Sequence, residues 1–282
     1  MGGRVVVVTD STAYLPDGLA DELSVRVVPL QVVLGGRSGA EGSEVTPAEV
    51  ALALAAWVPV STSRPTPAEF AAVYREALAG GASGVVSLHL SRELSGTWDS
   101  ARLAAAEVGA DSVQVVDSRS AAMGLGFAVL AAAHAAAAGG SPEEVYAAAV
   151  GTAERTTTLF YVDTLEHLRR GGRIGAAQAL LGTALSVKPI LHVRDGRIVP
   201  LEKVRTVSKG IARLEALAVA AASDGPADVA VHHLAAVERA ALLAERLRIR
   251  LPQVRQFYAS EVGAVVGAHV GPGVLGVVVV RH

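Results

Sequence analysis

The chain has 282 residues, of which 51% are hydrophobic, 18% charged and 4% aromatic, and its formal net charge is −2. The high apolar and low charged content exclude a disordered chain, and the lack of cysteine excludes disulfides, thiolate metal sites and cysteine nucleophiles. A sequence-independent nucleic-acid binder carries a basic excess, which this chain lacks. The length predicts two domains, and the lack of a secretory leader pattern predicts a cytoplasmic protein.

Short valine-rich runs alternate with helical patterns through the first half of the chain. Strands are expected at residues 4–9, 84–90 and 113–116, with a further apolar run at 25–34. Helices are expected near residue 16, after Thr46, Thr66 and Ser141, and over 97–108 and 121–138. The last of these approaches the length of a membrane span, but alanine and glycine dominate it, which favours a helix packed closely on a sheet. Strands that alternate with helices predict a mainly parallel sheet covered on both faces.

The second half shows a different pattern, in which a hairpin is mixed with helices. Strands are expected at residues 158–162, 187–193, 197–201, 229–232, 254–258 and 274–280, and helices at 164–170, 174–185, 206–222 and 235–248. The pair Asp195-Gly196 between two apolar runs predicts the hairpin turn. We therefore expect an α/β protein of two domains, with a parallel-sheet α/β domain over residues 1–156 and a mixed-sheet α+β domain over 157–282.

Two motifs that resemble cofactor sites lie in the wrong context. The segment Gly271–Gly276 matches the dinucleotide fingerprint, but it leads into a strand rather than a helix, so it cannot offer a helix N-terminus to a pyrophosphate. The pair His232-His233 lies on an expected strand, where neighbouring side chains point to opposite faces, which disfavours one shared metal ion. No metal and no resident cofactor are therefore expected.

Hydroxyl groups gather at several expected element ends. Asp10-Ser11-Thr12 and Asp117-Ser118 follow strands, at the edge where parallel sheets bind ligands, although such residues also cap helices and turns. The segments 61–67, 90–98 and 267–273 each combine hydroxyls or a histidine with glycine or proline. This composition suits an anion held by hydroxyl and backbone N–H groups, but each segment taken alone is more typical of a capped turn.

Read together, these segments resemble the DegV family, the fatty-acid-binding subunits (FakB proteins) of bacterial fatty acid kinase. The resemblance rests on segments that occur in order along almost the whole chain: Val8–Thr12, Thr62–Pro65, Leu94–Thr97, Val116–Ser118, Leu168–Ile174, Lys188–Leu191, Lys203–Thr206 and His269–Gly273. The chain departs from the usual pattern at Arg64, where glutamine is common, and at Trp98, where tyrosine is usual. Arg64 would add positive charge near the ligand's carboxylate.

The resemblance implies two α/β domains and a lipid tunnel for a long-chain fatty acid between and within them. It implies that Thr62 and Ser95 hold the carboxylate, with His269 nearby. It also implies a partner kinase that carries ATP and Mg²⁺ and converts the bound acid to an acyl phosphate, so that this chain has no catalytic residue of its own. A transient contact with a membrane surface fits the same role.

Two arginines are candidates for the transferred phosphoryl group or for docking of the kinase. Arg173 follows two glycines, and Arg205 follows an expected strand. A planar guanidinium can grip a phosphate with two hydrogen bonds, although arginine is also the usual occupant of solvated surfaces.

Two other functions compete with lipid presentation. A stand-alone acyl or phosphoryl transferase, or a hydrolase, could use Ser95 as nucleophile, with a base supplied from a distant segment. A transcriptional regulator is disfavoured by the slightly acidic charge and by the lack of a helix-turn-helix pattern.

Overall fold

The computed structural model describes residues 3–180, 188–223 and 225–282. Contacts divide the chain into two compact units, one of Met1–Gln31 with Ser63–Glu154 and one of Val32–Thr62 with Arg155–His282. A single boundary near residue 156 does not describe this division, because residues 32–62 belong with the second half. The helix α2 (Pro47–Ala55) packs against the helix α10 (Ala264–Val270), and a local sequence pattern cannot predict a contact between segments so far apart in the chain.

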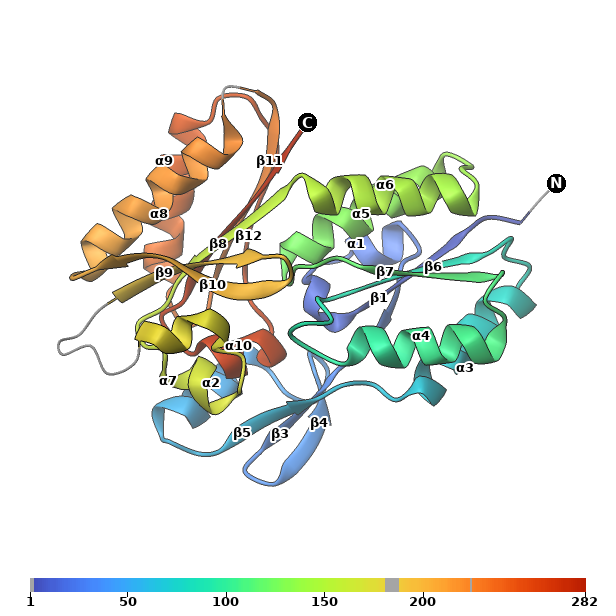
Figure 1. Ribbon diagram of the computed structural model, residues 1–282, viewed down its shortest axis with the longest axis horizontal. Coiled ribbons are helices and arrows are strands. Elements are labelled where there is room, and N and C mark those ends of the chain that lie inside the picture. Colours follow the sequence, from blue (N-terminus) through green and yellow to red (C-terminus); the bar gives the residue numbers. More distant parts are fainter. Residues whose placement is uncertain (1–2, 181–187, 224) are drawn as a thin grey trace. The chain divides into compact units, whose positions relative to one another are not determined.

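The first unit is built on a four-stranded parallel sheet in the order β2-β1-β6-β7 (Figure 1). Its strands are β1 (Val6–Asp10), β2 (Arg26–Val28), β6 (Val85–His89) and β7 (Val113–Asp117). Its helices are η1 (Ser11–Ala13), α1 (Leu19–Glu22), α3 (Pro67–Ala79), α4 (Thr97–Val108), α5 (Met123–Ala137) and α6 (Pro142–Glu154). The prediction of a parallel α/β domain is confirmed.

The two faces of this sheet pack into separate hydrophobic cores, and neighbouring side chains of β1 belong to different cores. Val7 packs with residues of α5 and α6, whereas Val8 packs with residues of α3 and α4. The alanine-rich helix α5 is therefore a core helix, and its small side chains allow close approach to the strands. Within the described residues, no helix is long and apolar enough to cross a membrane.

The second unit carries a six-stranded sheet in the order β10-β9-β8-β13-β11-β12, in which only the pair β11–β12 is parallel. Its strands are β8 (Thr156–Tyr161), β9 (Lys188–Arg194), β10 (Arg197–Val204), β11 (Ala227–His233), β12 (Val254–Glu261) and β13 (Leu275–Arg281). The predicted mixed sheet is confirmed. The hairpin turn is confirmed too, since Asp195 and Gly196 both have positive φ, at 52° and 78°, as a type I′ turn requires.

Helices α8 (Val207–Ala222) and α9 (Val237–Arg250) pack on one face of this sheet. The unit also contains the small sheet β4-β3-β5, whose strands are β3 (Gln31–Leu34), β4 (Arg37–Ala40) and β5 (Val60–Ser63). Its remaining helices are α2 (Pro47–Ala55), α7 (Glu166–Arg170), η2 (Gly175–Leu180) and α10 (Ala264–Val270).

Two sequence predictions for helices in this unit differ from the structure. A helix was expected over 174–185; the structure has a short 3₁₀ helix at Gly175–Leu180, and residues 181–185 of that prediction lie outside the described residues. No helix was predicted around His269, but His269 lies in the last turn of α10. This helix is only seven residues long, so its apolar pattern is too short to separate from that of a loop.

Candidate functional site

Thr62 and His269 form a hydrogen-bonded pair in the second unit. Thr62 lies near the end of β5 and His269 near the end of α10, and the distance between Thr62 Oγ1 and His269 Nε2 is 2.8 Å. The sequence proposed both residues as ligands of one anion, and the structure brings these two together. The pair has two protons to offer, one on the hydroxyl and one on the neutral ring, and the mutual hydrogen bond uses only one.

The imidazole of His269 is neutral at physiological pH. Burial, together with the nearby charge of Arg173, lowers the pKa of His269 to about 4. Its Nδ1 atom is buried and has no hydrogen-bond partner among the described residues. Arg173 lies close enough to His269 for its charge to contribute to this lowered pKa, and Arg173 Nη1 donates to the Gly171 carbonyl at 2.6 Å.

Glycines allow the chain to approach the two histidines of this neighbourhood closely. A Cβ at Gly171 would lie 2.1 Å from His269 Nδ1, and a Cβ at Gly271 would lie 2.1 Å from the ring of His167. Gly271 also has a φ of +77°, which other residues rarely adopt. Gly271 thus serves close packing and a tight turn after α10.

An ion cluster centred on Asp163 follows β8 in the same unit. Tyr161 Oη donates to Asp163 Oδ1 at 2.7 Å, Arg239 Nη1 to Oδ2 at 3.2 Å, and Lys188 Nζ to the Asp163 carbonyl at 2.9 Å. Burial opposes ionisation of Asp163, but the hydrogen bonds from Tyr161 and Arg239 outweigh it and lower the pKa. A Cβ at Gly273 would lie 2.1 Å from Asp163 Oδ2, so this cluster supports the turn that follows α10.

Sequence reasoning missed Asp163 and Arg239. The available signal was the position of Asp163 directly after a strand, the same signal that drew attention to Asp10 and Asp117. Nothing in the sequence connects it with Arg239, because the two lie on different elements 76 residues apart.

Ser95 belongs to the first unit and lies just before α4. Its Oγ atom is 2.9 Å from Thr97 Oγ1, and its backbone N–H donates to the Ser91 carbonyl at 3.0 Å. The first N–H groups of a helix carry positive partial charge, which suits an anion at this hydroxyl. The side chain of Arg64 lies against Gly96, and its Nη1 is 3.4 Å from the Gly96 carbonyl, so the expected extra charge lies beside Ser95.

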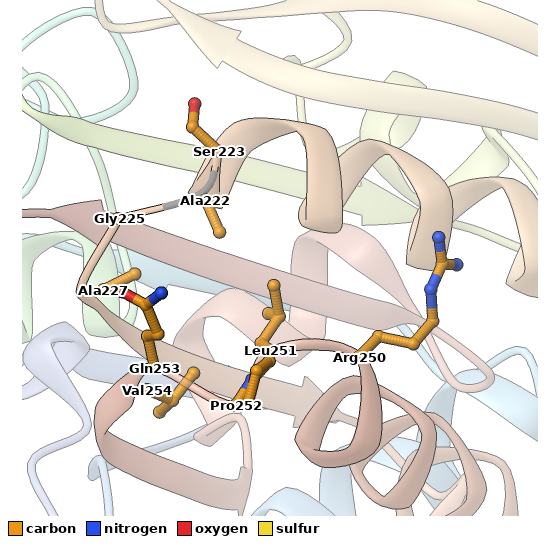
Figure 2. Close-up of a pocket in the computed structure, with 9 residues that line it drawn as sticks. All are labelled: Ala222, Ser223, Gly225, Ala227, Arg250, Leu251, Pro252, Gln253 and Val254. Atoms are coloured by element: carbon orange, nitrogen blue, oxygen red, sulfur yellow. The ribbon is translucent and has the colours of Figure 1, made fainter.

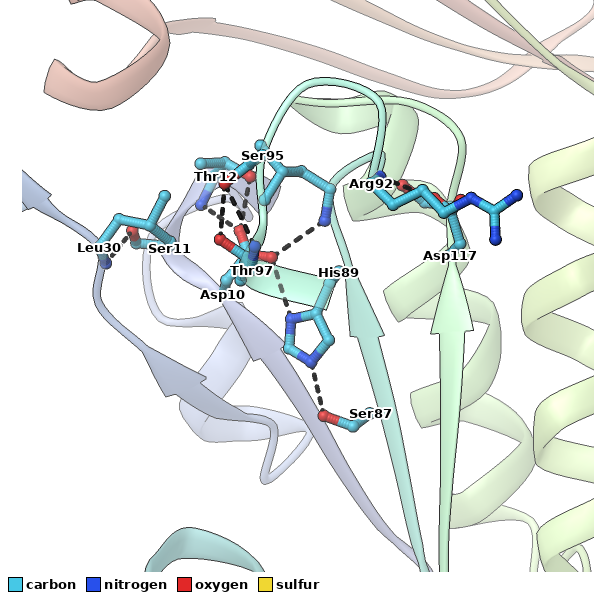
Figure 3. Close-up of polar contacts among 12 residues, drawn as sticks. Asp10, Ser11, Thr12, Leu30, Ser87, His89, Arg92, Ser95, Thr97 and Asp117 are labelled. Carbon is cyan, nitrogen blue, oxygen red and sulfur yellow. Dashed lines mark hydrogen bonds and ion pairs between the residues drawn. The ribbon is translucent and has the colours of Figure 1, made fainter. Parts of the chain in front are cut away.

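The first unit also holds a buried polar network at the end of β1 and β6 (Figure 3). Asp10 accepts from the backbone N–H of Thr12 at 3.0 Å, and its Oδ2 lies 3.1 Å from His89 Nδ1. His89 Nε2 in turn lies 2.7 Å from Ser87 Oγ. Asp117 is a loop cap, since it accepts from the N–H of Arg119 at 2.9 Å.

The remaining predicted residues lie apart from these groups. Arg205 is exposed directly after β10. His232 is buried, with Nδ1 3.2 Å from Ser260 Oγ, while His233 Nδ1 lies 3.8 Å from Glu261. The two rings thus have separate partners, and no group of three or more metal-ligating side chains is present among the described residues.

One surface pocket lies at the C-terminal ends of α8 and α9 (Figure 2). It is lined by Ala222, Ser223, Gly225, Ala227, Arg250, Leu251, Pro252, Gln253 and Val254, and its volume is about 120 Å³. Ligand sites for molecules of drug size occupy about 300–1,000 Å³. This pocket is therefore too small for a long acyl chain, and it contains none of the predicted site residues.

Comparison with known proteins agrees with the resemblance seen in the sequence. The family model described as "Uncharacterised protein, DegV family" matches residues 4–282. A DegV domain-containing protein of Streptomyces coelicolor is 56% identical over 279 residues, which covers 99% of each chain.

Two solved structures are similar over nearly their full length. One is described as showing fatty acid binding of a DegV family protein from Thermus thermophilus; it has a TM-score of 0.93 and 38% identity and covers 98% of this chain and 99% of that one. The other is DegV of Bacillus subtilis, described as a fatty acid binding protein, with a TM-score of 0.89, 37% identity and 99% coverage of both chains.

Proposed function

Because the chain belongs to the DegV family, we propose that it binds a long-chain fatty acid in an apolar tunnel and presents the carboxylate to a partner kinase, which converts it to an acyl phosphate. The Thr62–His269 pair is the observation that carries this proposal. The relatives of known structure whose descriptions report fatty acid binding support the choice of ligand.

The pair has the chemistry that a carboxylate requires. One of its two protons remains free for an acceptor: when the neutral ring donates from Nε2, the Thr62 hydroxyl keeps its own proton for the carboxylate. Ser95, beside the helix start of α4, is the third proposed ligand of the carboxylate. A histidine whose pKa is about 4 is a weak base at neutral pH, which suits binding better than proton transfer.

The acyl tail and the carboxylate head group of the ligand contribute unequally to the free energy of binding. Each buried methylene stabilises the complex by about 0.8 kcal/mol, so fourteen of them contribute on the order of 11 kcal/mol before the costs of association. A hydrogen bond to a charged group contributes about 1.5–3 kcal/mol. We therefore assign affinity to the tail and orientation of the reacting oxygen to Thr62, Ser95 and His269.

The proposed reaction needs positive charge that the acid itself lacks. A carboxylate oxygen attacks the γ-phosphorus of ATP, a new P–O bond forms, the bond to the β–γ bridging oxygen breaks, and ADP leaves. Arg173 and Arg205 are proposed to neutralise the transferred group or to dock the kinase. We assign ATP and Mg²⁺ to the kinase and propose that the reaction takes place in the cytoplasm. Transient contact with a membrane surface would exchange the lipid.

The competing enzyme hypothesis assigns a nucleophile to Ser95. The structure does contain a Ser–His–Asp arrangement, but it uses Ser87, His89 and Asp10, which are all fully buried. The described partner of the Ser95 hydroxyl is Thr97, not a base. A binding role for Ser95 therefore fits these contacts better than hydrolysis does.

A paired assay tests the proposal. The protein alone is titrated with palmitate, and acyl phosphate is then measured with a purified fatty acid kinase, ATP and Mg²⁺. We expect tight binding without turnover by the protein alone, and turnover once the kinase is added. Turnover without the kinase would replace this proposal by the enzyme hypothesis.

A further inference from the structure

A row of four hydrogen-bonded polar side chains connects α3 with strands β6 and β1 in the first unit. Tyr74 Oη donates to Ser87 Oγ at 2.8 Å, Ser87 Oγ lies 2.7 Å from His89 Nε2, and His89 Nδ1 lies 3.1 Å from Asp10 Oδ2. All four residues have 0% exposed surface. The carrier function described above makes no use of them.

The hydrogen bonds in this row run in one direction. The hydroxyl proton of Tyr74 goes to Ser87, and burial raises the pKa of Tyr74, so that proton stays in place. The single proton of Ser87 is then free to go to His89 Nε2. With Nε2 as acceptor, the ring carries its N–H at Nδ1, directed at the Asp10 carboxylate. Ser87, His89 and Asp10 follow one another in the same order as in a catalytic triad. They cannot act as one, because no substrate reaches a fully buried serine.

Asp10 joins the ends of two neighbouring strands. Its Oδ1 accepts from the N–H of Thr12 at 3.0 Å and from the Thr12 hydroxyl at 2.5 Å, just after β1. Its Oδ2 accepts from the N–H of Leu90 at 3.0 Å, just after β6. Figure 3 shows this carboxylate at the base of the loop that carries Ser95.

Backbone hydrogen bonds also hold the loop from Leu90 to Ser95 at its start, where it leaves β6. The N–H of Ser91 donates to the Ser120 carbonyl at 2.8 Å, and the N–H of Ser95 donates back to the Ser91 carbonyl at 3.0 Å. The place of the Ser95 hydroxyl therefore depends on the backbone at Leu90 and Ser91, and the Leu90 backbone is held by Asp10.

We infer that Asp10, oriented by His89, is a positioning residue that sets the Ser95 hydroxyl for the ligand's carboxylate; this inference rests on the proposed function. A buried ion pair or carboxylate costs desolvation energy, and apolar replacements are often as stable, so a buried carboxylate is poor evidence for stability alone. Such a network can instead hold a binding residue in a fixed orientation through hydrogen bonds to its backbone or side chain.

A double-mutant cycle separates positioning from general stability. Palmitate and its methyl ester are titrated against the wild type, Asp10→Asn, Ser95→Ala and the double variant, with Thr9→Val as matched control. Thr9 neighbours Asp10, is also fully buried, and its hydroxyl has no hydrogen-bond partner among the described residues, so valine replaces it with little loss.

Ser95→Ala should weaken palmitate binding about 10-fold, and Asp10→Asn by no more than that, about 3- to 10-fold. The ester should change little, because its uncharged carbonyl is a weaker acceptor of the hydroxyl proton than a carboxylate is. In the Ser95→Ala background, Asp10→Asn should cost less than about 2-fold, since coupled residues are not additive. Thr9→Val should leave both ligands unaffected. Equal losses by Asp10→Asn in both backgrounds, or for acid and ester alike, would overturn the inference.

Amide hydrogen exchange without ligand keeps this test independent of the proposed function. Asp10→Asn and His89→Phe should speed exchange at Leu94 and Ser95, whose N–H groups bond to Ser91, and leave Leu88 in β6 protected. If the wild type does not distinguish acid from ester, the carboxylate site fails and exchange alone decides the positioning role. Unchanged exchange at Ser95 in both variants would refute it, and His89→Phe carries both readouts should Asp10→Asn not fold.

Discussion

The hydroxyl of Thr62 is the side chain on which the proposed carboxylate site depends most directly. Thr62→Val keeps the shape of the side chain and removes both the bond to His269 and the proton offered to the ligand. We expect palmitate affinity to fall by roughly 1–3 kcal/mol, while methyl palmitate, which lacks the charge, changes little. Thr157→Val, on β8 of the same unit, is the matched control, and isothermal titration is the measurement. A variant that loses acid and ester equally would show that Thr62 supports the fold and not the head group.

Arg173 and Arg205 are the residues that should separate binding from turnover. Arg173→Ala and Arg205→Ala should leave palmitate affinity close to that of the wild type, because neither is assigned to the acyl tail. Kinase-coupled formation of acyl phosphate should fall, and lysine should restore it poorly because it lacks the planar fork. Arg255→Ala, exposed on β12, is the control. Normal turnover in both arginine variants would reduce these residues to ordinary surface cations.

For individual residues, the sequence predicted which side chains belong to the candidate site better than it predicted their hydrogen-bond partners. Thr62 and His269 were identified together through the family resemblance, and their hydrogen bond joins residues 207 positions apart. No periodicity or spacing could predict that contact. The Asp163 cluster was missed for the same reason, since Lys188, Arg239 and Tyr161 lie on three different elements.

The close packing of α10 against the segment after α7 depends on a residue without a side chain. Gly171 has no room for a Cβ, which would lie 2.1 Å from His269 Nδ1. We expect Gly171→Ala to push the imidazole away and to weaken palmitate binding about 10-fold, similar to the loss of one charged hydrogen bond. Gly225→Ala, where a Cβ meets nothing within 4 Å, should bind normally. Titration of both variants is the test, and equal affinities would mean that the histidine does not need its observed position.

Elements with strong local signals were predictable. Thr46 and Thr66 each form a capping box with the glutamate three residues later, as the motif required. Asp195-Gly196 makes the expected hairpin turn. By contrast, β4 and β5 are four residues long and α10 seven, and segments so short take their structure from the surfaces on which they pack.

At the scale of the whole molecule, the buried histidines make stability depend on pH. Burial lowers the pKa of His232 and of His269 to about 4, below the ordinary value of 6.5. Between these values the unfolded chain binds more protons than the folded one, so the free energy of unfolding falls as pH drops from about 6.5 to about 4. His232→Gln should flatten this dependence. Chemical denaturation at several pH values is the measurement, and a flat wild-type profile over that window would contradict the assignment.

The division into two units was only partly readable from the sequence. The change from a parallel to a mixed sheet is visible in the order of strands and helices, and the structure has both sheets. The return of residues 32–62 to the second unit is a property of long-range packing, with α2 against α10, and no linker composition marks it. The family resemblance, which runs from the first strand to the last, carries the functional reading across both units.

The most direct test of the central claim is to identify what the purified protein holds. Native mass spectrometry before and after extraction with organic solvent should show a long-chain fatty acid in about one copy per chain, because the acyl tail alone contributes on the order of 11 kcal/mol. Adding palmitate to the extracted protein should raise its melting temperature, since a ligand that binds the native state stabilises it. A protein that carries no fatty acid, and whose melting temperature does not respond to palmitate, would contradict the account.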